Sequence, residues 1–295
     1  MSKDITVCLS YDFDAMSLWI ANFRTESPNA LSRGEFGQVG AQRVLDLLAE
    51  YDIKSTWFVP GHTIEAFPGE CRRLVAEGHE VGHHGYCHEN PARLEIEKER
   101  AILERGIALI KGLTGRAPQG YRSPAGSFSA NTLGLLVEYG FLYDSSMLGN
   151  DFTPYYCRDG IKAVIDAPYD FGKPVELVEM PFSWNLDDFP FFEYTTSRRG
   201  ISQGLADPAR VYDVWAGDFE YLYSKIGRGV FILTMHPQVI GRGHRMLMLE
   251  RFIRDLRSHD GVTFSTMGEF VRRWKAGHPF AEAAAQPSKE MKQKQ

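Results

Sequence analysis

The chain has 295 residues, of which 43% are apolar, and a formal net charge of −5. This length allows one large α/β barrel or two smaller domains, and the apolar fraction can supply the core of a globular protein. No basic cluster stands out, which argues against a nucleic acid partner, and no apolar run approaches the ~20 residues that cross a bilayer.

The N-terminal segment and the cysteines predict a cytoplasmic protein. The segment MSKDITVCLSYDFD has no apolar run long enough for the core of a signal peptide. The four cysteines form no C-x-x-C pair, which suits reduced thiols better than a disulfide framework.

Strand-like and helix-like segments alternate along most of the chain. The expected strands are 5–11, 55–60, 79–83, 119–122, 141–145, 175–180 and 230–236. The expected helices are 38–51, 68–77, 92–113, 130–139, 208–226, 245–258 and 266–275. This alternation favours a parallel sheet with crossover helices. Residues 150–205 break the pattern, and the Ala-, Gln- and Lys-rich segment 277–295 is expected to be a partly ordered tail.

Four polar motifs occupy the C-terminal ends of predicted strands. They are SYDFDA (10–15), GHHGYCH (82–88), GYRSPAG (120–126) and LTMHP (233–237). In a (β/α) barrel these strand ends meet on one face, where catalytic residues gather. We therefore expect the four motifs to share one pocket.

The first two motifs contain the residue types of a catalytic metal site. His84 and His88 form an H-x-x-x-H pair, and Asp14 offers a third ligand. Residues i and i+2 of an extended segment point the same way, so Asp12 and Asp14 can face one cavity. Each motif alone leaves one other interpretation open. The histidines can be hydrogen-bonded loop residues, and the D-x-D segment can be a solvated acidic turn.

Together the motifs resemble those of the polysaccharide deacetylase (NodB-homology, carbohydrate esterase 4) superfamily over residues 10–236. The D-F-D spacing resembles the branch with cyclic imide hydrolases, metal-independent allantoinases and atypical peptidoglycan deacetylases. The resemblance implies an α/β fold, a distorted (β/α)7 barrel over residues 1–276, with an irregular insertion at about 150–205.

The resemblance also implies a role for each motif residue. Asp12 is the expected base, Arg122 its partner and His236 the general acid. The implied ligands of Zn²⁺, or of another divalent cation, are Asp14, His84 and His88. A metal-independent variant is an open alternative because of the D-F-D spacing.

Five further residues are candidates: Ala125, Trp184 and His244 for substrate binding, and Asp144 and His83 as secondary candidates. The backbone N–H of Ala125 takes the family's oxyanion position. The family's Asp-Trp pair is missing, which leaves Asp144 as the nearest candidate for the carboxylate that orients His236. His83 is expected to be structural or supporting. Trp184 can stack on a flat substrate or make an oligomer contact, and His244 can bind a polar ring edge or cap the helix 245–258.

These residues predict a hydrolase of carbon–nitrogen bonds other than peptide bonds, acting on a small molecule. The preferred hypothesis is a cyclic imide hydrolase (imidase), because wall polymers lie outside the membrane and no export signal is evident. The alternatives are a polysaccharide or peptidoglycan N-deacetylase and a catalytically inactive small-molecule-binding barrel. The resemblance further implies a homotetramer in which 150–205 makes contacts. The lack of a long apolar run predicts no membrane partner.

Overall fold

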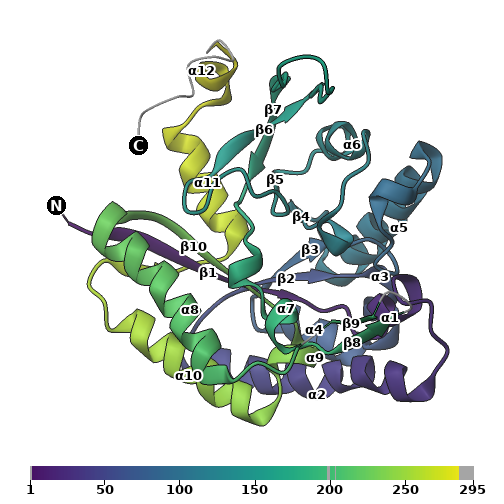
Figure 1. Cartoon of the computed structure of the whole chain (residues 1–295), viewed down its shortest axis with the longest axis vertical. Helices are drawn as coiled ribbons and strands as arrows, with labels where there is room; N and C mark the ends of the chain where they lie inside the picture. The colour runs from purple at the N-terminus through teal and green to yellow at the C-terminus, as the bar shows by residue number, and fades with distance from the viewer. Residues whose placement is uncertain (1, 198–199, 203, 286–295) are drawn as a thin grey trace.

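A curved, mostly parallel sheet runs through the middle of the molecule (Figure 1). The computed structural model describes residues 2–197, 200–202 and 204–285. The parallel strands lie in the order β10-β1-β2-β3-β4-β5-β7. Their bounds are β1 Asp4–Asp12, β2 Thr56–Val59, β3 Glu80–His83, β4 Gly120–Tyr121, β5 Tyr143–Asp144, β7 Lys173–Glu179 and β10 Arg228–Met235. The predicted distorted (β/α)7 barrel is confirmed, and within the described residues it stays open between β10 and β6 (Tyr155–Asp159), the strand that flanks β7.

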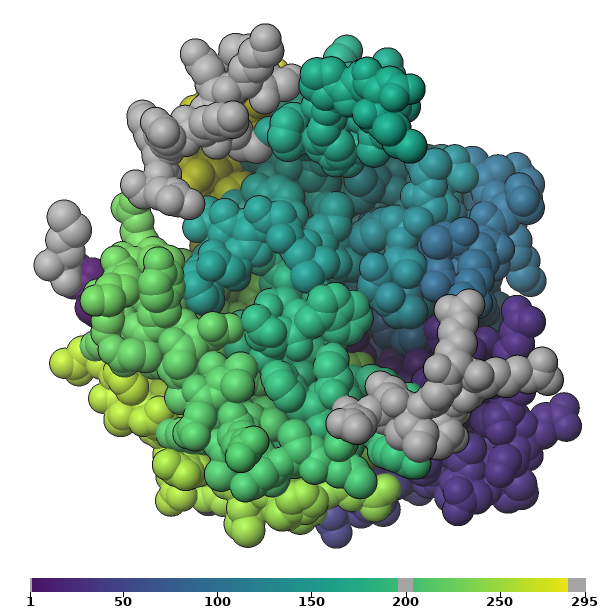
Figure 2. All heavy atoms as spheres, viewed as in Figure 1, coloured from purple at the N-terminus to yellow at the C-terminus, as the bar shows by residue number. Residues whose placement is uncertain are grey.

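Shorter strands lie outside this parallel order. β6 (Tyr155–Asp159) pairs antiparallel with β7, and the loop that joins them projects from the body (Figures 1 and 2). Ile165 in that loop is fully exposed. β8 (Thr195–Ser197) and β9 (Gly200–Ser202) form a separate hairpin. β11 (Val262–Phe264), which the sequence did not predict, pairs with the first half of β1.

Most helices cover the outer face of the sheet, whereas α11 and α12 pack against the apolar cluster on its inner face. Their bounds are α1 Ser17–Ala21, α2 Pro28–Glu50, α3 Gly61–Ala66, α4 Pro68–Ala76, α5 Ile96–Thr114, α6 Thr132–Glu138, α7 Asp188–Phe192, α8 Pro208–Tyr221, α9 Pro237–Ile240, α10 Gly243–Arg257, α11 Met267–Gly277 and α12 Phe280–Ala285. Part of the expected tail is therefore helical, and residues 286–295 of that tail lie outside the described residues. None of the helices that the structure describes is both long enough and apolar enough to cross a membrane.

Helix α2 begins ten residues before the expected helix 38–51, which was too short. Its first half carries buried glycines, which weaken a helical pattern in sequence. Gly40 is needed where α2 meets α9, because a Cβ there would overlap the carbonyl group of Pro237. Close packing between helices, and not helix propensity, explains this part of α2.

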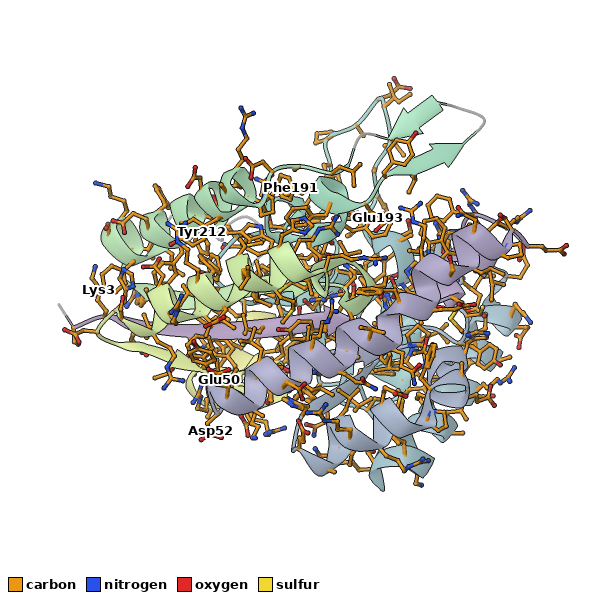
Figure 3. The ribbon with its side chains drawn as sticks, turned by 90° about the horizontal axis from the view of Figure 1, so that it is seen from below. Lys3, Glu50, Asp52, Phe191, Glu193 and Tyr212 are labelled. Atoms are coloured by element: carbon orange, nitrogen blue, oxygen red, sulfur yellow. The ribbon has the colours of Figure 1, made fainter. Side chains whose placement is uncertain are left out.

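Strand β1 is buried on both faces. Its odd-numbered side chains join the large core between the sheet and the helices, namely Ile5, Val7, Leu9 and Tyr11. Figure 3 shows side chains filling the space between β1 and helices α2, α8 and α10. Cys8 instead packs in a second cluster inside the barrel. Because side chains alternate along a strand, Ser10 and Asp12 share the inner face with Cys8.

Candidate metal and catalytic site

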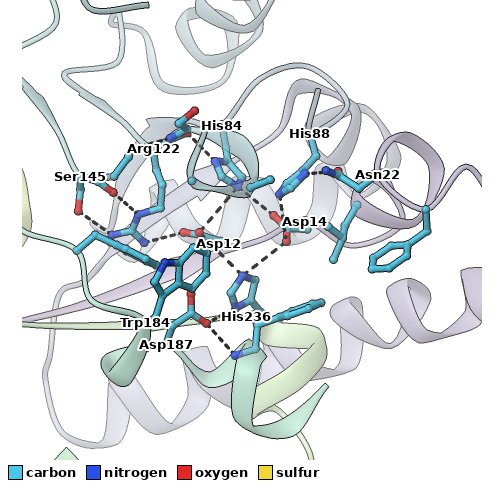
Figure 4. Close-up of a pocket in the computed structure, with 18 residues that line it drawn as sticks. Asp12, Asp14, Asn22, His84, His88, Arg122, Ser145, Trp184, Asp187 and His236 are labelled. Atoms are coloured by element: carbon cyan, nitrogen blue, oxygen red, sulfur yellow. Dashed lines mark hydrogen bonds and ion pairs between the residues drawn. The ribbon is translucent and has the colours of Figure 1, made fainter. Parts of the chain in front are cut away.

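A cavity of about 260 Å³ lies at the C-terminal ends of the parallel strands (Figure 4). All four sequence motifs contribute to its lining, as predicted. The polar and small lining residues from these motifs are Asp12, Asp14, His84, His88, Arg122, Ser123, Ala125, Gly126 and His236. The large apolar lining residues are Leu18, Phe23, Phe182, Trp184 and Phe189. The cavity thus joins titratable groups to an aromatic wall.

Asp14 lies between two histidine rings. Its Oδ1 is 3.3 Å from Nε2 of His84, and its Oδ2 is 3.8 Å from Nε2 of His88. Burial would raise the pKa of Asp14, but His88, His84 and His236 lower it to about 2. Burial lowers the pKa of His88 to about 4, so that ring is neutral, the form that binds metal ions.

These three residues fit a divalent cation. Their ligand atoms lie within 4.8 Å of one another. Within the described part of the chain, both carboxylate oxygens of Asp14 and Nε2 of His84 are buried without a hydrogen-bond partner. Unpartnered buried polar atoms are costly unless something else satisfies them. An Asp/His/His set is a usual ligand set for a catalytic Zn²⁺ site.

The other nitrogen of each ring is anchored, as in metal sites. Nδ1 of His84 lies 2.7 Å from the carbonyl oxygen of Arg122. Nδ1 of His88 lies 2.6 Å from Oδ1 of Asn22, at the end of α1. Both contacts direct Nε2 of the two rings toward Asp14.

Arg122 holds one side of Asp12. Its Nη1 donates to Oδ1 of Asp12 at 2.8 Å and to Oγ of Ser10 at 3.0 Å. Its Nε and Nη2 donate to the carbonyl oxygen and Oγ of Ser145, each at 2.9 Å. Oδ2 of Asp12 remains near Nε2 of His84 at 3.8 Å and near Nε2 of His236 at 4.0 Å. The guanidinium therefore balances the charge of Asp12 while one carboxylate oxygen faces the other site residues.

His236 is held by an acidic pair that follows β7. Oδ1 of Asp188 lies 2.7 Å from its Nδ1, and Oδ2 of Asp188 accepts from its backbone N–H at 3.0 Å. Asp187 lies farther away, with Oδ1 3.8 Å from Nδ1. Burial would lower the pKa of His236, but Asp188 and Asp187 raise it well above its usual value. The ring is therefore a proton donor whose Nε2 lies 3.7 Å from Oδ2 of Asp14.

Asp144 does not orient His236, which corrects the expectation from the sequence. Asp144 is buried on β5, where its Oδ1 accepts from Oγ of Ser146 at 2.8 Å. Nδ1 of His236 is engaged by Asp188 instead, so Asp144 is not the carboxylate that orients the ring. The signal that could have identified Asp188 was the adjacent acidic pair in N-L-D-D-F, within an otherwise aromatic segment.

The remaining predicted residues fall into two groups. Ala125 and Trp184 line the cavity, and Trp184 is half-exposed beside Gly126. His83 is buried outside it, stacked on Tyr121, so its part is structural. His244 is exposed at the first turn of α10 and is not among the lining residues, so the expected contact with a substrate ring is not supported. It does not cap α10 either, because the N-cap residue is Arg242.

Strained backbone surrounds the site. Ala15, His88 and Ala125 adopt left-handed φ values of 50°, 56° and 58°. Such conformations are unfavourable for residues other than glycine and concentrate at functional sites. Surrounding contacts therefore hold the metal-ligand and Ala125 turns in geometries that the local sequence does not prefer.

Comparison with known proteins agrees with this site. The polysaccharide deacetylase family model matches residues 34–143. The chain is 40% identical over 284 residues to the peptidoglycan deacetylase of Helicobacter pylori, covering 92% of this chain and 96% of that protein. It is 33% identical to a peptidoglycan deacetylase-like protein of Gibberella zeae, covering 92% and 87%.

Solved structures share the fold along nearly the whole chain. A Mycobacterium smegmatis protein described as a polysaccharide deacetylase superposes with a TM-score of 0.81 at 32% identity, covering 94% of this chain and 92% of its own. An allantoinase superposes with a TM-score of 0.76 at 24% identity, covering 94% and 92%, which is a likeness of fold alone. The full-length matches and the assembled motifs confirm the predicted resemblance: this chain belongs to the polysaccharide deacetylase family, hydrolases of carbon–nitrogen bonds other than peptide bonds.

Proposed function

We propose that this protein hydrolyses the N-acetyl amide of an amino sugar, releasing acetate and a free amine. The observation that carries the proposal is one cavity that joins three groups of side chains. These are the donor set of Asp14, His84 and His88, the Asp12–Arg122 pair and the His236–Asp188 pair. The name of the H. pylori relative supports an N-acetylated glycan over other amides.

The first proton transfer falls to Asp12. A divalent cation held by Asp14, His84 and His88 supplies a Lewis acid for the amide carbonyl when it is bound. Oδ2 of Asp12 is the oxygen that accepts a proton from the attacking water, because Oδ1 is engaged by Arg122. The backbone N–H of Ala125 is our candidate donor to the negatively charged oxygen of the tetrahedral intermediate.

The second proton transfer falls to His236. Its Nε2 faces the cavity, while Asp188 holds Nδ1 and the backbone N–H of the same residue. The protonated ring donates to the leaving nitrogen, which departs as an amine. Asp188 keeps the imidazole in one orientation throughout, as the buried carboxylate of a triad does.

A cyclic imide is the second candidate substrate, and a specific feature favours it. The aromatic wall, with Trp184 half-exposed beside Gly126, can stack on a flat ring. The same residues could open an imide ring. The second carbonyl group makes the leaving nitrogen less basic, so its departure depends less on protonation by the general acid. The two candidates therefore differ in the substrate and share the machinery.

One assay separates these candidates. Purified protein is treated with a chelator, resupplied with Zn²⁺, and given N-acetylglucosamine oligomers, peptidoglycan fragments, succinimide and hydantoin. Acetate release that requires Zn²⁺ and disappears in Asp12→Asn supports the deacetylase. Faster opening of the imides would move the assignment to an imidase, and turnover of none of them would favour a binding barrel. His244→Ala is the matched control, since this exposed histidine lies outside the cavity.

A further inference from the structure

Two carboxyl groups lie behind the site and have no part in the proton transfers. Asp144 of β5 and Glu179 of β7 are paired in the sheet register, and both are fully buried. Two ionised carboxylates in contact repel each other strongly inside a protein, and such pairs retain a proton. A buried acidic pair is therefore costly unless its hydrogen bonds stabilise the surrounding structure.

The hydrogen bonds of this pair are nearly complete. Oε1 of Glu179 accepts from the backbone N–H groups of Ser146 and Met147, each at 2.9 Å. Oδ1 of Asp144 accepts from Oγ of Ser146. Oδ2 of Asp144 is buried without a donor among the described groups, and Glu179 lies beside Asp144 in the sheet register. A proton carried between the two carboxyl groups would satisfy that oxygen.

The segment held by this pair contacts the site directly. Oγ of Ser146 accepts from the backbone N–H of Ser123 at 2.8 Å, at the start of the turn that contains Ala125. Ser145, one residue earlier, accepts two hydrogen bonds from Arg122. A displacement of residues 145–147 would therefore move both the partner of Asp12 and the Ala125 turn.

We infer that Asp144 and Glu179 share one proton and act as positioning residues, fixing residues 145–147 and through them Arg122 against Asp12. The inference rests on the proposed function only for its kinetic readout. Neither residue touches the substrate cavity.

The surroundings of the pair agree with one retained proton. Burial raises the pKa of Asp144 to about 6 and that of Glu179 well above its usual value. Arg122 faces the pair and favours its charged forms. The other titratable groups facing it are Tyr121 of β4 and Tyr155 and Cys157 of β6, which burial keeps neutral. Sγ of Cys157 lies 3.9 Å from Oε2 of Glu179, so one weak donor is all that β6 adds.

The decisive variant is Glu179→Gln. The amide mimics the protonated carboxyl group, because its oxygen can accept from residues 146 and 147 while its NH₂ donates to Asp144. We expect kcat to stay within about threefold of the wild type, whereas Glu179→Ala lowers kcat roughly 10- to 100-fold with little change in KM. The exposed Glu176→Gln on the same strand is the matched control.

An infrared measurement tests the shared proton without any substrate. The difference spectrum between wild type and Glu179→Gln near neutral pH should contain the carbonyl band of a buried protonated carboxylic acid. The Glu176→Gln difference spectrum should lack it. Absence of the band in the Glu179→Gln spectrum, or an unchanged kcat in Glu179→Ala, would overturn the inference. If the wild type hydrolysed none of the substrates, the proposed function would fail while the infrared result still decided the pair.

Discussion

Replacing Asp188 with Asn should disable the acid while leaving the metal site intact. Asp188 makes two contacts to His236, one to Nδ1 at 2.7 Å and one to the backbone N–H at 3.0 Å. The asparagine carbonyl can keep the backbone contact. Its NH₂ group then faces Nδ1, where the protonated ring carries a proton of its own, so the ring contact is lost.

The size of the effect follows from the lost contact. A hydrogen bond to a charged group contributes about 1.5–3 kcal/mol. Since 1.36 kcal/mol corresponds to a factor of ten in rate, kcat should fall roughly 10- to 150-fold. KM should change little, because Asp188 is not among the cavity-lining residues.

Steady-state kinetics on the best substrate, with Zn²⁺ saturating, provide the measurement. Asp187→Asn is the matched control, because that carboxylate lies 3.8 Å from Nδ1 and is placed next to Asp188 in sequence. It should lose less kcat than Asp188→Asn. An Asp188→Asn variant with nearly wild-type kcat, or a larger loss in Asp187→Asn, would refute the assignment of the orienting carboxylate.

Three further predictions concern the metal ligands, the aromatic wall of the cavity and the pH dependence of stability. His84→Ala should abolish the Zn²⁺ binding seen by calorimetry while circular dichroism stays native; zinc binding of unchanged affinity would contradict the ligand set. Trp184→Ala should raise KM roughly 2- to 10-fold with little change in kcat, because the substrate loses its contact with the indole ring. Initial rates measured over a range of substrate concentrations test this. Burial raises the pKa of Asp144 in the folded protein to about 6. Its contribution to the free energy of unfolding is therefore fully present below about pH 4 and is lost as pH rises through 6. Between pH 5 and pH 8, the free energy of unfolding measured with denaturant should therefore fall more in the wild type than in Asp144→Asn.

Much of the catalytic face could be predicted because local patterns determine it. β1 is buried on both faces, so its alternation sends Asp12 inward, and Asp14 follows at the next equivalent position. Parallel strands carry their C-terminal ends to one edge, so motifs far apart in sequence, such as those of His84 and His236, converge there.

The errors arose where contacts between distant segments decide the structure. Helix α2 carries buried glycines that local propensity counts against a helix, whereas their packing against other segments favours it. β11 spans Val262–Phe264 and exists through its pairing with β1. The motif order points to Asp144, but it does not reveal that the segment after β7 lies beside β10.

The opening between β6 and β10 explains why the acid is held by a loop and not by a strand. Asp187 bridges to Thr234 of β10, so the segment after β7 occupies part of the free edge of β10 that a further strand would take in a closed barrel. Asp188 then begins α7, one residue later, against His236. Trp184 lies on the same segment and lines the same cavity. The aromatic wall and the support of the acid are therefore coupled, and a change of substrate made by remodelling this segment must preserve the Asp188–His236 contact.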